Sequence, residues 1–102
     1  MSFFKKLFGN KEREIQTFLE QGAIVIDVRT PEEFKMGHAK NAVNIPLQEI
    51  SSQMEKIRQF NKPIITCCKS GARSLSATNI IRNQGIEVMN GGSWQKVDQY
   101  LK

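Results

Sequence analysis

The sequence predicts an α/β domain in which helices cover both faces of a parallel sheet. Four short segments rich in β-branched residues alternate along the chain with segments whose apolar residues recur at helical spacing. The chain has 102 residues, enough for one domain to bury a core without a metal or a disulfide. We therefore expect a single domain over residues 1–102, with residues 1–10 as an N-terminal extension whose structure the sequence leaves open.

The first expected elements are a helix and a buried strand. Asn10 is placed to cap a helix that runs to about Gln21, and Gly22 suits the position after its end. Residues 23–28 are rich in β-branched residues and apolar at successive positions. This pattern predicts a strand that is buried on both faces.

A second helix start is marked by the sequence Thr-Pro-Glu-Glu at residues 30–33. Thr30 can cap the helix, Pro31 suits its first position, and Glu33 can complete a capping box. Gly37 limits this helix to little more than one turn.

The remaining expected elements are a strand at 42–45, a helix from a second capping box at 52–55, a strand at 63–68, a helix from about 72 to 84, a strand at 86–89 and a terminal helix after the glycine pair at 91–92.

The charge and hydropathy of the chain exclude some classes of function. The formal net charge is +5, from 15 Lys and Arg against 10 Asp and Glu. The basic residues are scattered among acidic ones and are not interleaved with stacking aromatics, so we expect no nucleic-acid binding. No apolar run approaches the ~20 residues of a membrane span, and residues 1–10 lack the pattern of a secretory signal. We expect a soluble, cytoplasmic protein.

The extension carries four apolar residues, Phe3, Phe4, Leu7 and Phe8, at helical spacing. A short amphipathic helix that touches anionic lipid or a partner would explain this pattern. A segment this short has little membrane affinity, so we expect it to pack on the domain or to be disordered, without membrane contact.

The segment that carries chemistry follows the strand expected at 63–68. Cys68 stands at the carboxyl end of that strand, followed by a glycine-containing loop and the start of a helix. Ligands bind at this edge of open α/β sheets, and loop amides together with a helix N-terminus form an anion site. The same environment lowers the pKa of a thiol, and Lys69 and Arg73 add positive charge. The sequence thus predicts a nucleophile and an anion site in one loop.

The neighbouring Cys67 is expected to be structural. Side chains alternate along a strand, so Cys67 points away from Cys68 and packs against a helix. The two cysteines and the distant His38 do not have the spacing of metal ligands, so we expect no metal and no cofactor.

Three motifs in this chain resemble those of the rhodanese-like sulfurtransferase family. They comprise IDVRTPEEF at 26–34 with GHA at 37–39 and AVNIPL at 42–47, then CKSGARS at 68–74, then GGSW at 91–94. Their order and spacing match the family over most of the chain, and three motifs in register are far more specific than one. The chain departs from the pattern at Ala39, where a larger aliphatic is usual, and at Asn41, where glycine is common.

The resemblance implies a five-stranded parallel sheet flanked by helices on both faces, in a single-domain rhodanese. It implies that Cys68 forms a persulfide and that the loop Lys69, Ser70, Gly71, Ala72 and Arg73 cradles it. It further suggests that Asp27, Arg29 and Glu33 form a structural polar network; His38 is also expected to be structural.

The implied reaction moves a sulfane sulfur from a donor such as thiosulfate to an acceptor, namely cyanide, a small thiol or a protein thiol. The protein is expected to act as a monomer.

Two alternatives to this function stay open. Cysteine-dependent phosphatases and arsenate reductases use a related loop, but theirs is one residue longer than the six residues from Cys68 to Arg73. A non-catalytic regulatory or binding module is the other alternative, although inactive relatives often lack the cysteine.

Overall fold

A parallel sheet forms the centre of the molecule. The computed structural model describes the backbone of residues 2–101 and the side chains of residues 11–101. The strands are β1 (Ile24–Asp27), β2 (Val43–Asn44), β3 (Ile64–Cys68) and β4 (Val88–Ser93). Their order in the sheet is β2-β1-β3-β4, and each neighbouring pair is parallel. All four carboxyl ends therefore point to the same edge.

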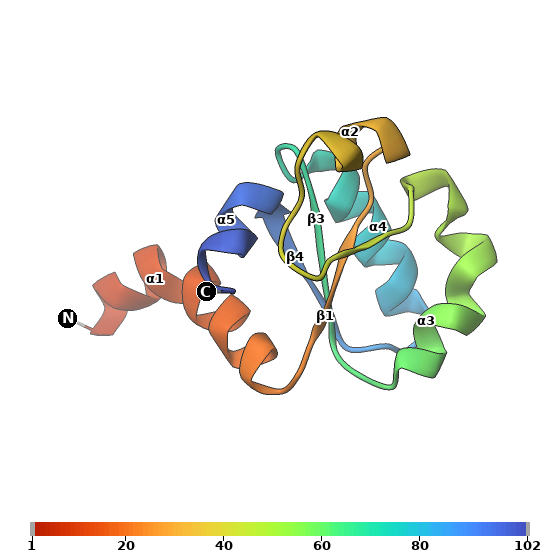
Figure 1. The fold of residues 1–102 in the computed structure, drawn as a ribbon. Helices are drawn as coiled ribbons and strands as arrows, with labels where there is room; N and C mark the ends of the chain where they lie inside the picture. The colour runs from red at the N-terminus through yellow and green to blue at the C-terminus, as the bar shows by residue number, and fades with distance from the viewer. Residues whose placement is uncertain (1, 102) are drawn as a thin grey trace.

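Helices cover both faces of this sheet, as the sequence predicted (Figure 1). The helices are α1 (Ser2–Glu20), α2 (Pro31–Met36), α3 (Met54–Phe60), α4 (Ala72–Asn83) and α5 (Trp94–Gln99), with two 3-10 turns at Leu47–Glu49 and Ser51–Gln53. Helices α1 and α5 lie on one face, and α3 and α4 lie on the other (Figure 1). The short α2 lies at the edge where the strands end (Figure 1).

The strands are buried on both faces because their side chains alternate between two apolar clusters. The cluster beneath α3 and α4 contains Ile26 of β1 and Ile64 of β3. The cluster beneath α1 and α5 contains Val25 and Ile65 from the same two strands, together with Val97 of α5. Register is consequently fixed on both faces, since a shift by one residue would exchange the two sets.

The sheet has four strands among residues 2–101, so the expectation of five is wrong. The reason lies in the segment ahead of β1. Its apolar residues Ile15, Phe18 and Leu19 have helical spacing and pack on the sheet from α1. The four β-branched segments of the sequence form the four strands, and residues 2–101 contain no further strand that could pair with them.

The start of the first helix also differs from expectation. Helix α1 begins at Ser2, and Asn10 lies inside it rather than capping it. Extending a helix adds one hydrogen bond for each residue fixed, so an internal residue that can cap does not by itself stop it. The expected roles of Phe3, Phe4, Leu7 and Phe8 fall on side chains outside the described residues.

Two further expectations are corrected in the second half of the chain. Residues 52–55 form no capping box, because α3 begins at Met54 without a side-chain cap and the Ser52 hydroxyl donates back to the Glu49 carbonyl at 3.0 Å. The last strand starts at Val88 and continues to Ser93 rather than ending at Met89.

The glycine at position 91 explains how β4 continues. A Cβ there would lie 2.6 Å from Val97 Cγ2 and 2.8 Å from Ile65 Cγ2. Only a residue without a side chain lets β4 stay this close to β3 and α5.

Other local signals are confirmed. Thr30 caps α2 in a reciprocal capping box with Glu33, and Gly37 ends that helix. Asn41, which replaces a common glycine, has a φ of 62°, a conformation that asparagine tolerates better than most residues. Ala39, which stands where a larger aliphatic is usual, is fully buried.

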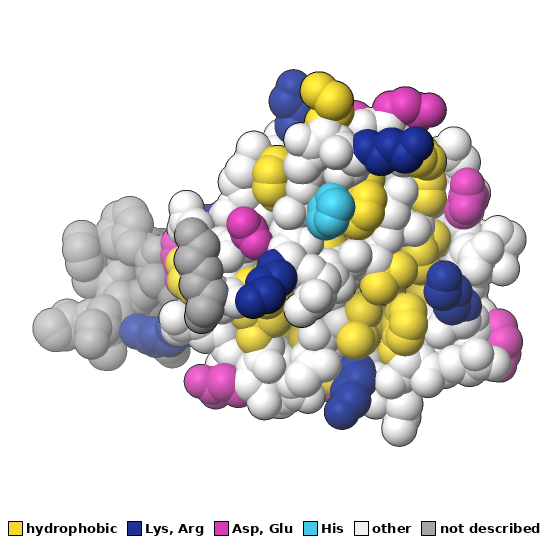
Figure 2. Space-filling view, in the orientation of Figure 1, with side chains coloured by type: hydrophobic (Ala, Val, Ile, Leu, Met, Phe, Trp, Pro, Cys, Tyr) yellow, Lys and Arg dark blue, Asp and Glu magenta, His cyan; other side chains and the backbone are white. Residues whose placement is uncertain are grey.

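Basic and acidic side chains are dispersed over the face of the molecule shown in Figure 2, with no large patch of either sign. No helix in the described part of the chain has both the length and the apolar character that crossing a bilayer requires.

Candidate active site

The candidate site lies where β3 ends and α4 begins. Cys68 is the last residue of β3, residues 69–71 form a tight turn, and α4 starts at Ala72. Gly71 makes this turn possible, since its φ of +106° is strained for other residues. A Cβ at Gly71 would also lie 3.4 Å from the Cα of Gly92, so the turn packs closely against the end of β4.

The turn curls around the Cys68 sulfur. The Gly71 amide donates to Sγ at 3.0 Å and the Ser74 amide at 3.4 Å. The Ser74 hydroxyl lies 3.4 Å from the same sulfur. The two amide donors, at the N-terminus of a helix, stabilise a negatively charged sulfur more than a neutral one.

These contacts decide the ionisation of Cys68. Burial alone raises the pKa of the thiol, because it disfavours the charged form. Hydrogen bonds from the Ser74 hydroxyl and from the amides of Ser74, Gly71 and Ser70 act in the opposite direction. The pKa of Cys68 is lowered as a result, so the thiolate forms more readily than in an ordinary cysteine.

Cys67 lies on the opposite face of the sheet. It belongs to the apolar cluster beneath α1 and α5, whereas Cys68 belongs to the one beneath α3 and α4. Burial, and then the negative charge of Asp27, raise the pKa of the Cys67 thiol. The alternation argument thus predicted the placement of both cysteines.

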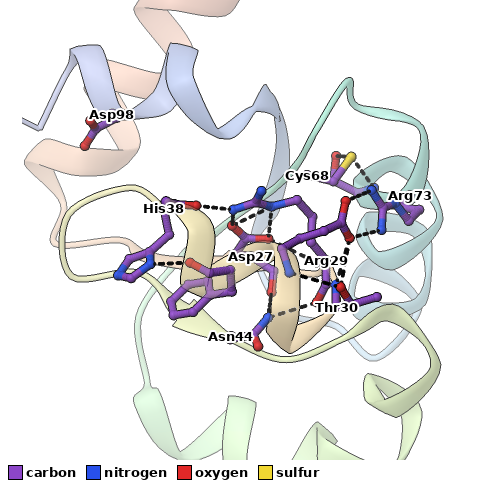
Figure 3. A network of polar contacts seen from close by, with 12 residues as sticks. Asp27, Arg29, Thr30, His38, Asn44, Cys68, Arg73 and Asp98 are labelled. Atoms are coloured by element: carbon purple, nitrogen blue, oxygen red, sulfur yellow. Dashed lines mark hydrogen bonds and ion pairs between the residues drawn. The ribbon is translucent and has the colours of Figure 1, made fainter.

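The two loop cations differ in their surroundings. Lys69 is exposed. Arg73, by contrast, forms a bidentate ion pair with Glu33 of α2, with N–O distances of 2.7 and 3.0 Å (Figure 3). Hydrogen bonds from Arg73 and then from the Thr30 amide lower the pKa of Glu33 to about 2. Arg73 thus fastens α4 to α2, a contact that the sequence did not predict.

A buried ion pair lies at the same edge of the sheet, directly after β1. Asp27 and Arg29 pair at 2.8 Å, and both side chains are almost fully buried. The Arg29 guanidinium also donates to the Gly37 carbonyl at 2.7 Å (Figure 3). It lies 5.1 Å from the centre of the Trp94 ring. This pair connects β1 to the end of α2 and to α5. The expected structural role of Asp27, Arg29 and Glu33 agrees with these contacts, since Glu33 completes the capping box of α2 and pairs with Arg73 of α4.

Two residues of the site received no role from the sequence, although Ser74 is the last residue of the motif at 68–74. Ser74 is fully buried beside the Cys68 sulfur, and Asn90 in β4 connects to both Ser74 and the turn. Asn90 could have been found from its position, since it directly precedes the glycine pair at the carboxyl end of the strand next to β3. Ser74 could have been found from its place in the first turn of α4.

The remaining candidate, His38, has a local role. Its ring stacks on Phe34 with centroids 3.7 Å apart, and its Nδ1 lies 2.7 Å from the Phe34 carbonyl oxygen. Among the side chains of residues 11–101, no group of three or more His, Cys, Asp and Glu is arranged to hold a metal ion.

Comparison with known proteins agrees with this geometry. Residues 12–97 match the model of a family described as Rhodanese-like domain. A thiosulfate sulfurtransferase GlpE of Vibrio cholerae is 36% identical over 73 residues, which cover 71% of this chain and 68% of the relative. Among solved structures, a rhodanese with anions from E. coli is 30% identical, with a TM-score of 0.66, over 72% of this chain and 89% of that one. A reduced CoADR-RHD from Bacillus anthracis is 32% identical, with a TM-score of 0.71, over 87% of this chain but 16% of that longer one.

Proposed function

Since the chain belongs to the rhodanese-like domain family, we propose that it is a sulfurtransferase that works through a persulfide on Cys68. The observation that carries this proposal is the cradle of two amides and one hydroxyl around the Cys68 sulfur. A sulfur held in this way is poised to ionise and attack. The name of the Vibrio cholerae relative, a thiosulfate sulfurtransferase, supports thiosulfate as one donor.

The proposed reaction has two steps. The Cys68 thiolate attacks the outer sulfur of thiosulfate, the bond between the two sulfur atoms of thiosulfate breaks, and sulfite leaves with the bonding electron pair. An acceptor such as cyanide or a thiolate then attacks the outer sulfur of the persulfide. The Cys68 thiolate is regenerated, and cyanide leaves as thiocyanate. Because the nucleophile is an anion from the start, no general base is needed.

The other loop residues receive distinct roles in this proposal. The amides of Ser70 and Gly71 stabilise the negatively charged sulfur, and Ala72 begins the helix whose N-terminus faces it. Lys69, which is exposed, attracts an anionic donor. Arg73 acts differently and holds the loop in place through its ion pair with Glu33.

The length of the loop argues against the phosphatase alternative. Six residues run from Cys68 to Arg73, one fewer than in the loops of cysteine-dependent phosphatases and arsenate reductases. A tetrahedral oxyanion needs a wider ring of amides than a single sulfur atom does. The binding-module alternative is less well supported, because a scaffold has no need of a thiol with donors arranged around it.

We further propose that the protein acts in the cytoplasm as a monomer, with a small sulfane-sulfur donor and a small or protein thiol as acceptor. Both cysteines are free and buried on opposite faces of the sheet. A reducing compartment suits a reaction that needs a free thiol at Cys68.

Intact-mass spectrometry tests the proposed function directly. After incubation with thiosulfate, we expect the protein to gain the mass of one sulfur atom, and cyanide should remove it. The Cys68→Ser variant should gain nothing under the same conditions. A wild-type protein that gains no sulfur from thiosulfate or from an uncharged sulfane donor would show that the domain is not a sulfurtransferase.

A further inference from the structure

The Asn90 side chain connects three parts of the site. Its Nδ2 donates to the Gly71 carbonyl at 3.0 Å, so it holds the turn after Cys68. Its Oδ1 accepts from the Gly92 amide at 3.0 Å and from the Ser74 hydroxyl at 2.7 Å. Asn90 thus ties the end of β4 to the turn and to the first turn of α4.

The orientation of this amide is fixed by its partners. The Gly71 carbonyl can only accept a hydrogen bond, and the Gly92 amide can only donate one. Rotating the Asn90 amide by half a turn would break both contacts, so Oδ1 is the atom that faces Ser74. Because a carbonyl oxygen has no proton, the Ser74 hydroxyl must be the donor in this contact.

A hydroxyl has a single proton, and two groups compete for that of Ser74. The hydroxyl oxygen lies 2.7 Å from Asn90 Oδ1 and 3.4 Å from the Cys68 sulfur. While its proton points to Asn90, the hydroxyl offers Cys68 only lone pairs. These lone pairs accept a hydrogen bond from a thiol but repel a thiolate. To stabilise the thiolate, the Ser74 proton has to leave Asn90.

We propose that Asn90 is a positioning residue that competes with the Cys68 sulfur for the Ser74 proton and thereby restrains ionisation of Cys68. The inference concerns the site of the proposed sulfur transfer, but it stands on hydrogen-bond geometry alone. Ser74 itself does not depend on Asn90 for its place. Its carbonyl accepts hydrogen bonds from the hydroxyls of Thr78, at 2.7 Å, and Thr66, at 3.2 Å.

The charged and titratable groups around Cys68 leave this competition intact. Arg73 is paired with Glu33, and Lys69 is exposed at the next position of the chain. Cys67 stays protonated on the other face, where burial raises its pKa. On the β4 side, the groups in this hydrogen-bond network are uncharged: the Asn90 side chain, which contacts Ser74, and the Gly92 amide, which contacts Asn90. Removing the Asn90 amide therefore changes no charge near the sulfur.

The test is the pH dependence of Cys68 alkylation by iodoacetamide in the full chain, which requires no sulfur donor. Asn90→Ala frees the Ser74 proton for the thiolate, so the pKa of Cys68 should fall by about half a unit to one unit, a three- to tenfold larger thiolate fraction at low pH. A loop that merely became looser would lose amide contacts to the sulfur, and the pKa would rise instead. The sign of the shift therefore separates competition from simple loss of structure.

A second background, Ser74→Ala, and a control variant complete the experiment. In a Ser74→Ala background there is no proton to compete for, and Asn90→Ala should no longer lower the pKa. Asn44→Ala is the matched control, because Asn44 is another half-buried asparagine whose Nδ2 donates to two carbonyls, those of Asp27 and Arg29. It should leave the pKa of Cys68 unchanged.

A raised or unchanged pKa of Cys68 in Asn90→Ala, or an equal fall in the wild-type and Ser74→Ala backgrounds, would overturn the proposal.

Should Asn90→Ala fail to fold, Asn90→Asp keeps the acceptor oxygen and binds the Ser74 proton more strongly. The pKa of Cys68 should then rise, and the rise should be smaller in the Ser74→Ala background. An equal rise in both backgrounds would overturn the proposal as well. A protein that shows the predicted shifts but accepts no sulfur would keep this inference while refuting the proposed function.

Discussion

Cys67 and Cys68 are neighbours in sequence but face different layers of the molecule. Their exposed fractions are 0% and 1%, so solvent exposure does not distinguish them. Cys67 is surrounded by apolar side chains of the cluster beneath α1 and α5, and burial raises its pKa. Cys68 is as little exposed to solvent, yet hydrogen bonds from the turn and from Ser74 outweigh its burial and lower its pKa.

Hydrogen-bond donors at its sulfur thus distinguish Cys68 from Cys67. A buried thiolate is costly only when nothing replaces the water it has lost. The turn after β3 supplies that replacement on one face of the strand, and the packed side chains of α1 and α5 supply none on the other. Five predictions test this difference, in order of expected effect.

The largest difference should come from removing each sulfur in turn. Cys68→Ser should lose sulfur transfer by about 10⁴-fold or more, since it removes the nucleophile itself. Cys67→Ser should keep activity within about threefold, because its side chain touches no reacting atom. The measurement is thiocyanate formation from thiosulfate and cyanide. Comparable losses in the two variants would mean that both faces of β3 take part in the reaction.

Alkylation of the wild-type protein should separate the two thiols without any mutation. Cys68 should react with iodoacetamide with a midpoint below the ~8.5 of an ordinary cysteine. Cys67 should react about a thousandfold more slowly in the native state, because burial raises the pKa of its thiol and leaves very little thiolate. Peptide mapping after timed alkylation gives both rates, and urea-unfolded protein, in which the rates should converge, is the control.

The lowered pKa of Cys68 also has a consequence for stability. Its folded pKa lies below the unfolded value, so the contribution of Cys68 is fully present above about pH 8.5 and is lost as the pH falls through the lowered folded pKa. The Cys68→Ser variant should therefore lack this part of the pH dependence of unfolding. An unchanged profile in the variant would argue against a lowered pKa.

The packing on the Cys67 face can be probed at Gly91. Gly91→Ala should lower the free energy of unfolding by about 3 kcal/mol, because the added methyl group overlaps fixed atoms of β3 and α5. Gly85→Ala is the control, since a Cβ there meets nothing within 4 Å and only the φ of +82° is strained. It should cost about 1–2 kcal/mol. Urea unfolding measures both, and equal losses would mean that this face is less tightly packed than the contacts imply.

The smallest effect concerns the loop cations. Lys69→Gln should reduce kcat/KM for thiosulfate about three- to fivefold while sparing an uncharged sulfane donor, and added salt should shrink the difference. Arg73→Gln should reduce the use of both donors alike, because Arg73 is paired with Glu33 and acts on the shape of the loop. The exposed Lys56 of α3 provides a neutral control as Lys56→Gln. A selective loss of thiosulfate use in Arg73→Gln would show that its charge is available to substrate.

Much of this arrangement follows from local sequence. The β-branched segments predicted the strands, Thr30 and Glu33 predicted the capping box of α2, and strand alternation predicted that the two cysteines face opposite layers. Each of these features depends on residues within a few positions of one another. Local sterics and hydrogen bonding are then enough to determine them.

Features that join distant parts of the chain were decided only by the tertiary structure. The pairing of Arg73 with Glu33 spans 40 residues, and the contact of Asn90 with Ser74 spans 16. The absence of a fifth strand among residues 2–101 likewise depends on how α1 packs against the sheet. The sequence by itself predicted which residue carries the proposed nucleophile and where it lies along the chain. Only the fold decided which charges and hydroxyl protons reach that sulfur, because those partners come from other strands and helices that packing brings together at one edge of the sheet.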